Sequence, residues 1–277
     1  MKTPRSVNTF ASPLDALRWH IEMGADELID HVPVDRYATA VKSTSPAPET
    51  IAASVRPTEM VTTMRQASGP ALAPAEGARD AIDIAAGAVT VEDLFTRLKA
   101  FDGCALKFTA TNTVFADGRP GANLMFVGEA PGVDEDRQGL PFVGVSGQLL
   151  DRMLMALGYA RSSVYITNIL FWRPPGNRSP TAAETAACLP FVRRHVELVR
   201  PKLLVLLGGS AAKNMLDRSE GIMRLRGKWF DYVSDGLDVS IPAMPTFHPA
   251  FLLRQPAQKR EAWRDFLAIQ ERLEGLD

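Results

Sequence analysis

The sequence predicts a three-layer α/β/α protein, in which helices cover both faces of a central, mostly parallel, four-stranded sheet. Two observations predict it: short apolar or β-branched runs recur along the chain, and stretches with helical periodicity lie between them. This alternation is typical of a parallel sheet. The predicted strands are residues 123–127, 164–168, 203–207 and 243–247, with 228–233 as a further candidate. The predicted helices are residues 147–157, 182–199, 210–216 and 258–273.

Composition divides the chain into three parts. Residues 1–35 hold a helical segment, because Ser12 can cap a helix, Pro13 suits its first turn, and Leu and Ile then recur at helical spacing. Residues 36–90 are rich in Ala, Pro, Thr, Ser and Gly without a sustained period, which predicts a flexible linker. Residues 91–277 are predicted to form the domain that carries the function.

The composition excludes several classes of protein. Of the 277 residues, 46% are hydrophobic and 23% are charged, which is ordinary for a globular domain with extra sequence. No stretch approaches the roughly 18 apolar residues of a membrane span, so we expect no membrane attachment. Two cysteines exclude a disulfide scaffold and indicate a reducing compartment, the cytoplasm. The formal net charge of −1 argues against a generally basic nucleic-acid coat.

Chemically distinctive side chains follow each of the four predicted strands. Glu129 lies after the first strand, Asn168 ends the second, and His248 follows the fourth. A Gly-Gly-Ser turn ending in Ser210 follows the third. Each residue alone has an ordinary structural explanation, as a cap or a turn. Because ligands bind outside the carboxyl ends of parallel strands, their convergence at this edge predicts a functional site.

In combination, these motifs resemble the uracil-DNA glycosylase superfamily, and family 4 in particular. The resemblance runs from about Phe101 to Trp263 and rests on GEAPG (128–132), PFVG (141–144), SGQLL (146–150), YITN (165–168), RPPGNR (173–178), RG (226–227) and HPA (248–250). It implies a uracil-DNA glycosylase-like catalytic domain. Such an enzyme flips uracil out of DNA and hydrolyses its N-glycosidic bond, leaving an abasic site. It also implies uracil-containing DNA as partner, and we expect a monomer associated with the nucleoid.

The resemblance implies three residues for uracil recognition. Phe142 would stack on the flipped base, and backbone groups at Ala130 would complete the contacts. Asn168 would donate to the uracil O4 and accept from N3–H at once. Cytosine inverts that pattern, so its binding would leave buried polar groups unpaired.

For the chemical step, the resemblance implies an acid and an imidazole. Glu129 would position or activate water and face the sugar cation, and His248 would donate to the uracil O2 as a neutral ring. Glu135 is a second candidate acid, which would close the pocket near C5. Asp134 competes for the water role, and the sequence does not separate these acids.

For DNA binding, the candidates are basic or small polar residues for phosphates and an apolar wedge. Arg173 and Arg178 lie in a Pro/Gly loop without an acidic neighbour, and Ser210 and Arg254 are further phosphate candidates. Leu252, in the apolar run 251–253, is the candidate wedge, although it equally suits the start of a core helix.

Family 4 usually holds an iron–sulfur cluster with four cysteines. Cys104 and Cys188 match two of these positions, but Phe101 and Trp172 occupy the other two. Because such clusters need four protein ligands, we predict no cluster and no metal. Aromatic packing would fill the space, with the two cysteines buried and adjacent.

Three alternatives to a catalytic glycosylase were weighed. A related group binds uracil-DNA covalently through a histidine in the loop that here spans residues 173–180, but this loop has Asn177 and Arg178 and no histidine. A non-catalytic DNA-binding module on the same fold is favoured by the two lost cysteines and opposed by the retained site residues. A nucleotide-binding α/β enzyme lacks support, since no P-loop or G-x-G-x-x-G motif is present.

Overall fold

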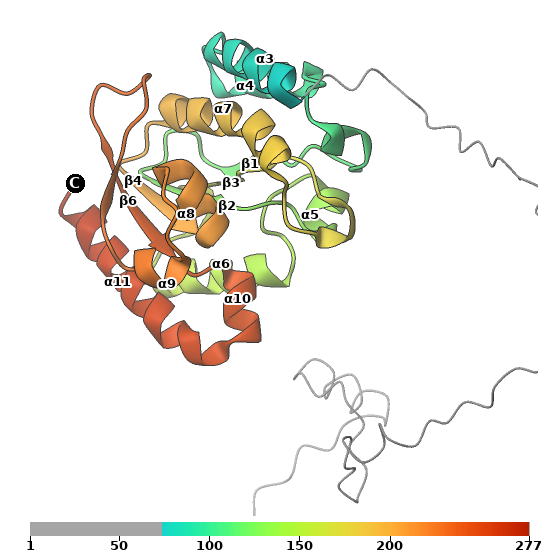
Figure 1. Cartoon of the computed structure of the whole chain (residues 1–277). Helices are drawn as coiled ribbons and strands as arrows, with labels where there is room; N and C mark the ends of the chain where they lie inside the picture. The colour runs from blue at the N-terminus through green and yellow to red at the C-terminus, as the bar shows by residue number, and fades with distance from the viewer. Residues whose placement is uncertain (1–73, 277) are drawn as a thin grey trace, which may run out of the picture. The chain divides into compact units, whose positions relative to one another are not determined.

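A six-stranded mixed sheet forms the centre of the fold (Figure 1). In this computed structural model, which describes residues 74–276, the strand order is β1-β3-β2-β4-β6-β5. The strands are β1 (Ala116–Gly118), β2 (Leu124–Gly128), β3 (Tyr165–Asn168), β4 (Leu203–Leu207), β5 (Phe230–Tyr232) and β6 (Ile241–Thr246). The predicted α/β class is therefore confirmed.

The sheet has two more strands than the four that were predicted. The four predicted strands are the parallel centre, β3-β2-β4-β6, and β1 and β5 add antiparallel edges. The candidate strand at 228–233 forms β5. Strand β1 was missed because it is a three-residue Ala-Asp-Gly segment whose only signal is its pairing with β3.

The carboxyl ends of the central strands are aligned. Gly128 pairs opposite Asn168, and Leu207 pairs opposite Thr246. Strands β2 and β4 are buried along their whole length, which explains why their sequences are continuous apolar runs rather than alternating ones. The loops that follow these strands consequently leave the sheet at one edge.

Helices cover both faces of the sheet, as predicted. They are α3 (Pro74–Ala86), α4 (Val91–Ala100), α5 (Val133–Gln138), α6 (Val145–Ala156), α7 (Ala182–Val199), α8 (Gly209–Leu216), α9 (Ile222–Leu225), α10 (Pro249–Arg254) and α11 (Lys259–Glu274). Alternate residues of β2 pack into different layers: Met125 and Val127 contact the cluster with α3, α4, α7 and α8, whereas Leu124 and Phe126 contact that with α6 and α11. None of the described helices is both long and apolar enough to cross a membrane.

The predicted linker, residues 36–90, includes residues that belong to the folded domain. Residues 74–86 form α3, which packs against α7, and Ala81 and Ala85 are buried there. Alanine side chains allow close approach between helices but produce a weak hydrophobic pattern, which explains the error. The rest of the predicted linker and the predicted helix at residues 12–30 lie outside the described residues.

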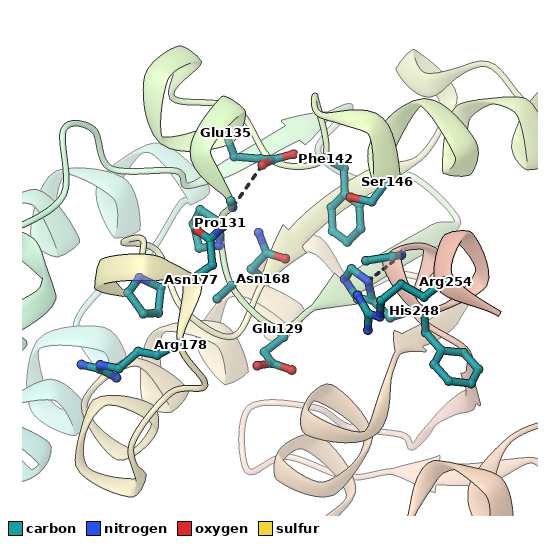
Figure 2. A pocket seen from close by; sticks show the side chains of 15 residues that line it. Glu129, Pro131, Glu135, Phe142, Ser146, Asn168, Asn177, Arg178, His248 and Arg254 are labelled. Carbon is teal, nitrogen blue, oxygen red and sulfur yellow. Dashed lines mark hydrogen bonds between the residues drawn. The ribbon is translucent and has the colours of Figure 1, made fainter. Parts of the chain in front are cut away.

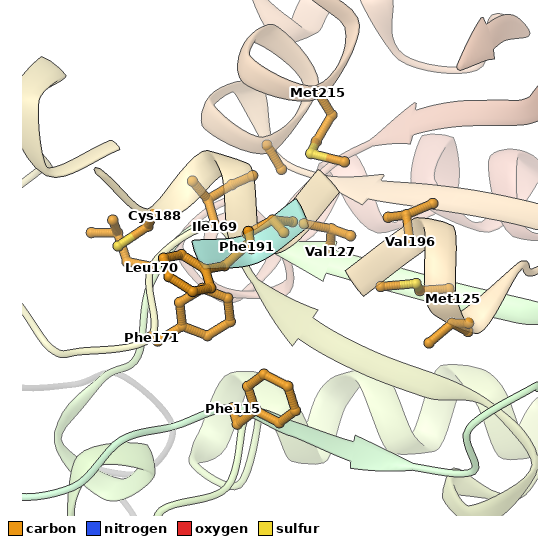
Figure 3. Packing of buried hydrophobic residues seen from close by; sticks show 14 of the residues in the cluster. Phe115, Met125, Val127, Ile169, Leu170, Phe171, Cys188, Phe191, Val196 and Met215 are labelled. Carbon is orange, nitrogen blue, oxygen red and sulfur yellow. The ribbon is translucent and has the colours of Figure 1, made fainter. Parts of the chain in front are cut away.

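Phe115, Phe171 and Phe191 pack among aliphatic side chains in the layer between the sheet and α7 (Figure 3). Phe115 packs against Phe171, and its ring stacks on His195 with the centroids 4.4 Å apart. His195 is fully buried, and its Nε2 lies 2.7 Å from the Tyr165 hydroxyl. Burial lowers the pKa of His195 to about 3, so this histidine is a neutral part of the core.

Candidate active site

A cavity of about 410 Å³ opens at the aligned carboxyl edge of the sheet (Figure 2). This volume is within the usual range for small-ligand pockets. The structure brings eight of the predicted site residues to its wall, namely Glu129, Ala130, Glu135, Phe142, Asn168, Arg178, His248 and Arg254. Ser146 and Asn177 also line it and were not predicted as site residues, although each lies inside a quoted motif. Phe251, which belongs to the run 251–253 predicted to supply the wedge, lines it as well.

Asn168, at the end of β3, has an unpartnered amide. The side chain is 1% exposed, and neither Nδ2 nor Oδ1 forms a hydrogen bond with any residue that the structure describes. A Cβ atom at Gly128 would collide with this Oδ1 and with the Phe142 ring, so the glycine keeps the space between them open. An unpaired buried donor or acceptor costs about 1–3 kcal/mol. A ligand edge with one donor and one acceptor would satisfy both atoms.

Phe142 and His248 provide two rings in the cavity. Their centroids are 5.4 Å apart, with an interplanar angle of 31°. Phe142 is 4% exposed and has φ +54, a left-handed conformation that is unusual for a bulky residue. A planar ligand held by Asn168 would therefore meet an aromatic face.

His248 caps the N-terminus of α10, and this contact sets its tautomer. Its Nδ1 accepts a hydrogen bond from the Ala250 amide at 3.1 Å, so a neutral ring carries its proton on Nε2. Burial, together with the positive charge of Arg254, lowers the pKa of His248 to about 4. At neutral pH the ring is uncharged and offers Nε2–H as a donor.

Geometry separates the three candidate acids. Glu129 lines the cavity, and burial raises the pKa of its carboxyl group. Glu135 also lines it, but its Oε1 accepts from the Val143 and Gly144 amides at 3.0 and 2.8 Å, and its Oε2 accepts from the Gly132 amide at 3.0 Å. Asp134 pairs with Arg137 outside the cavity wall. Glu129 is thus the acid that best fits a chemical role.

The predicted phosphate contacts lie around the cavity in different settings. Arg254 and Arg178 line it, and Arg178 forms a two-pronged ion pair with Glu184 at 2.9 and 2.5 Å. The expectation that Arg178 has no acidic neighbour was therefore wrong, because the start of α7 brings Glu184 back to the loop. Arg173 donates to the Asn177 side chain at 2.7 Å. Ser210 lines an adjoining groove that shares Glu129 with the cavity.

The predicted wedge residue Leu252 is part of the core. Its side chain is fully buried and packs with Leu149 and Phe247. It cannot insert into a base stack, and the helical alternative considered for it is correct. Its neighbours Phe251 and Leu253 are half-buried, so either can contact a ligand at the surface.

The side chains around the two cysteines do not fit a four-ligand iron–sulfur cluster. Cys104 and Cys188 are buried with their Sγ atoms 4.0 Å apart, so the predicted adjacency is confirmed. Phe101 packs against Phe191 at 5.1 Å, and the Trp172 indole N–H donates to Thr113 at 3.1 Å. Within residues 74–276, no group of three or more His, Cys, Asp or Glu could hold a metal ion.

Comparisons with known proteins match the part of the chain that holds the cavity. The model of the Uracil DNA glycosylase superfamily matches residues 115–267. The chain is 40% identical over 186 residues to the type-4 uracil-DNA glycosylase of Archaeoglobus fulgidus, covering 66% of this chain and 92% of that protein. It is 39% identical over 165 residues to the type-4 enzyme of Thermotoga maritima, covering 59% and 83%. The span matched by the family contains every residue that lines the cavity.

The unpartnered amide generates a stability prediction. We expect that Asn168→Leu, which replaces the amide by an apolar group of similar size, does not lower the free energy of unfolding. Thr167→Val is the matched control, because this neighbouring, fully buried residue of β3 donates its hydroxyl to the Phe115 carbonyl. The control should lose about 1–3 kcal/mol in urea unfolding. An equal loss in both variants would show that the Asn168 amide is satisfied within the protein.

Proposed function

The chain belongs to the uracil-DNA glycosylase superfamily, and we propose that it is a monofunctional DNA repair glycosylase that hydrolyses the N-glycosidic bond of uracil and leaves an abasic site. The observation that carries this proposal is the buried, unpartnered amide of Asn168 at the end of β3. The relatives matched over most of their length are named uracil-DNA glycosylases, which supports the same reaction.

Recognition of the base follows from the wall of the cavity. The Asn168 Nδ2 is placed to donate to the uracil O4 while its Oδ1 accepts from N3–H, and the Phe142 ring stacks on the base. Cytosine presents a donor and an acceptor in the reverse order, so its entry leaves two buried polar pairs unmatched. Each mismatch costs about 1–3 kcal/mol. This supports selectivity for uracil without an editing step.

The chemical step needs stabilisation of two opposite charges. As the bond breaks, the sugar acquires oxocarbenium character and uracil departs as an anion. The carboxylate of Glu129 faces the sugar cation and orients water, while Nε2–H of His248 donates to the uracil O2. The neutral state of His248, which burial favours, lets this ring donate without adding a fixed positive charge.

Extrusion of the base costs a few kcal/mol, which contacts to the DNA strand offset. Arg254 lines the cavity beside His248, and Arg178 lines it from the loop at residues 173–180, which also carries Arg173. Ser210 lines the adjoining groove. Phe251 and Leu253 replace Leu252 as candidates for the apolar wedge.

We propose that the protein acts on uracil-containing DNA as a monomer in the cytoplasm, without membrane attachment.

Turnover is favoured over covalent capture of DNA. The loop at residues 173–180 contains no histidine, and its Arg173 and Asn177 side chains bond to each other at 2.7 Å. The loop therefore lacks the histidine through which the related group forms its covalent adduct. Retention of Glu129, Phe142 and Asn168 in one cavity also weighs against a purely binding role.

We further propose that the protein works without the iron–sulfur cluster that its family resemblance implies. Two thiols are too few for a cluster held by four protein ligands. The side chains of Phe101 and Trp172 at the other two positions are buried in the aromatic core and provide no thiolate. Packing and one indole hydrogen bond then hold together the segments that a cluster would join.

The first test is release of uracil from a labelled oligonucleotide that holds one uracil, followed by alkali and without added metal. We expect strand scission at the uracil and no gel-stable protein–DNA adduct. Asn168→Asp should slow single-turnover release by about 5- to 150-fold, because the new carboxylate cannot donate to O4. Oligonucleotides with cytosine or thymine at the same place serve as controls. Intact uracil DNA with the unmodified protein would refute the proposed function.

The pH dependence of the rate should identify the acid. Glu129 acts as a carboxylate, and its raised pKa means that the rate increases with pH through a value above that of an ordinary glutamate, then levels off. Glu129→Gln should lower the plateau about 100-fold or more and remove this limb. Asp134→Asn, in the first turn of α5 and outside the cavity wall, is the control that should keep it. If the rate of Glu129→Gln still rises with pH in the same range, another group is responsible for that rise.

Absence of the cluster is tested on the purified, untagged protein. We expect a colourless preparation with negligible iron, and unchanged uracil release after treatment with an iron chelator. Cys188→Ala should retain both the fold and the activity, since the thiol acts only as a small buried group. A brown preparation with stoichiometric iron would contradict the proposal.

A further inference from the structure

The peptide groups of residues 141–144 are held by two side chains from outside the segment. This segment carries Phe142, whose left-handed backbone conformation is strained in a non-glycine residue. Such a conformation persists only where its surroundings impose it. The contacts around the segment therefore decide where the Phe142 ring lies.

Glu135 is the first of the two side chains that hold this segment. Its carboxylate accepts from the amides of Val143 and Gly144, the two peptide groups after Phe142. On the helix side, a Cβ atom at Gly147 would collide with the Phe142 carbonyl, so the start of α6 lies directly against this residue. Neither contact is a hydrogen bond to the carbonyl oxygens of Pro141 and Phe142.

Arg161 restrains those two carbonyls. Its Nη1 donates to the Phe142 carbonyl at 2.9 Å, and its Nη2 donates to the Pro141 carbonyl. The guanidinium of Arg161 is directed at the protein, and Arg161 is absent from the cavity wall.

Two acids hold Arg161 in this orientation. Nε pairs with Asp117 on β1 at 2.5 Å, and Nη1 pairs with Asp151 on α6 at 2.9 Å. The arginine side chain is 23% exposed. The planar guanidinium can bond all four acceptors at once because its five N–H groups diverge in fixed directions, which an ammonium cannot reproduce.

We propose that Arg161 is a positioning residue for base recognition, which holds the Pro141 and Phe142 carbonyls so that the Phe142 ring lies over the uracil site. The proposal rests on the proposed function, in which Phe142 stacks on the flipped base. It makes β1, a short edge strand remote from the chemistry, part of the support for the site through Asp117.

Arg161→Lys tests the proposal by single-turnover uracil release. The expected loss is about tenfold to hundredfold, because a stacking ring displaced by an ångström no longer matches the reacting geometry. Arg194→Lys is the matched control: Arg194 is 24% exposed, donates to the Ala88 carbonyl, pairs with Glu197, and does not line the cavity. The control should keep its rate, and thermal unfolding should show whether both variants are folded at the assay temperature.

A double-mutant cycle with Phe142→Leu separates positioning from general support of the fold. If Arg161 acts through the Phe142 ring, Arg161→Lys costs less than about threefold once the ring is gone. A role in stability alone would reduce the rate by the same factor in both backgrounds. Asp151→Asn removes one of the two acids that orient Arg161, and it replaces Arg161→Lys in the cycle if that variant does not fold.

The outcomes distinguish the two proposals. An active unmodified protein whose rate is insensitive to Arg161→Lys overturns the positioning role and leaves the proposed function intact. Equal losses in the presence and absence of the Phe142 ring overturn it as well. An unmodified protein that releases no uracil overturns the proposed function, and the positioning role with it.

Discussion

The parallel register of β3, β2, β4 and β6 is the constraint on which the rest of this structure depends. Because Gly128 lies opposite Asn168 and Leu207 opposite Thr246, the loops after these strands leave the sheet at one level. Burial of both faces enforces the register, since a slip of one residue would exchange the two sets of side chains between the layers. The cavity is the space that these loops enclose.

Burial at this edge serves the chemistry in three ways. It lowers the pKa of His248, which keeps the ring neutral as its role needs, and it raises the pKa of Glu129, which makes the Glu129 carboxylate a stronger base toward water. It also strengthens any hydrogen bond that the Asn168 amide makes with a base, because water competes poorly there. The cost is an amide that no described residue satisfies. Such local destabilisation is typical of sites that are complete only with a ligand.

Aromatic packing holds together the region of the two cysteines. Phe101, Phe171, Trp172 and Phe191 are almost fully buried, and burial of one such side chain contributes about 1.5–3 kcal/mol. They join the segment after α4 to the loop after β3 and to α7. Packing of this kind requires a close fit between the side chains.

Local periodicity predicted the fold class, the four parallel strands and the bounds of α7. Eight of the residues that line the cavity followed from the motifs after the strands and from the family resemblance that these motifs carry. The burial of α3 and Leu252, the pairing of Arg178 with Glu184, and the use of Arg161 inside the protein depend on tertiary contacts. Local sequence carries little signal for these contacts. Whether an arginine faces DNA or a carbonyl depends on which acids the fold brings beside it, and for Arg161 those acids lie on β1 and α6.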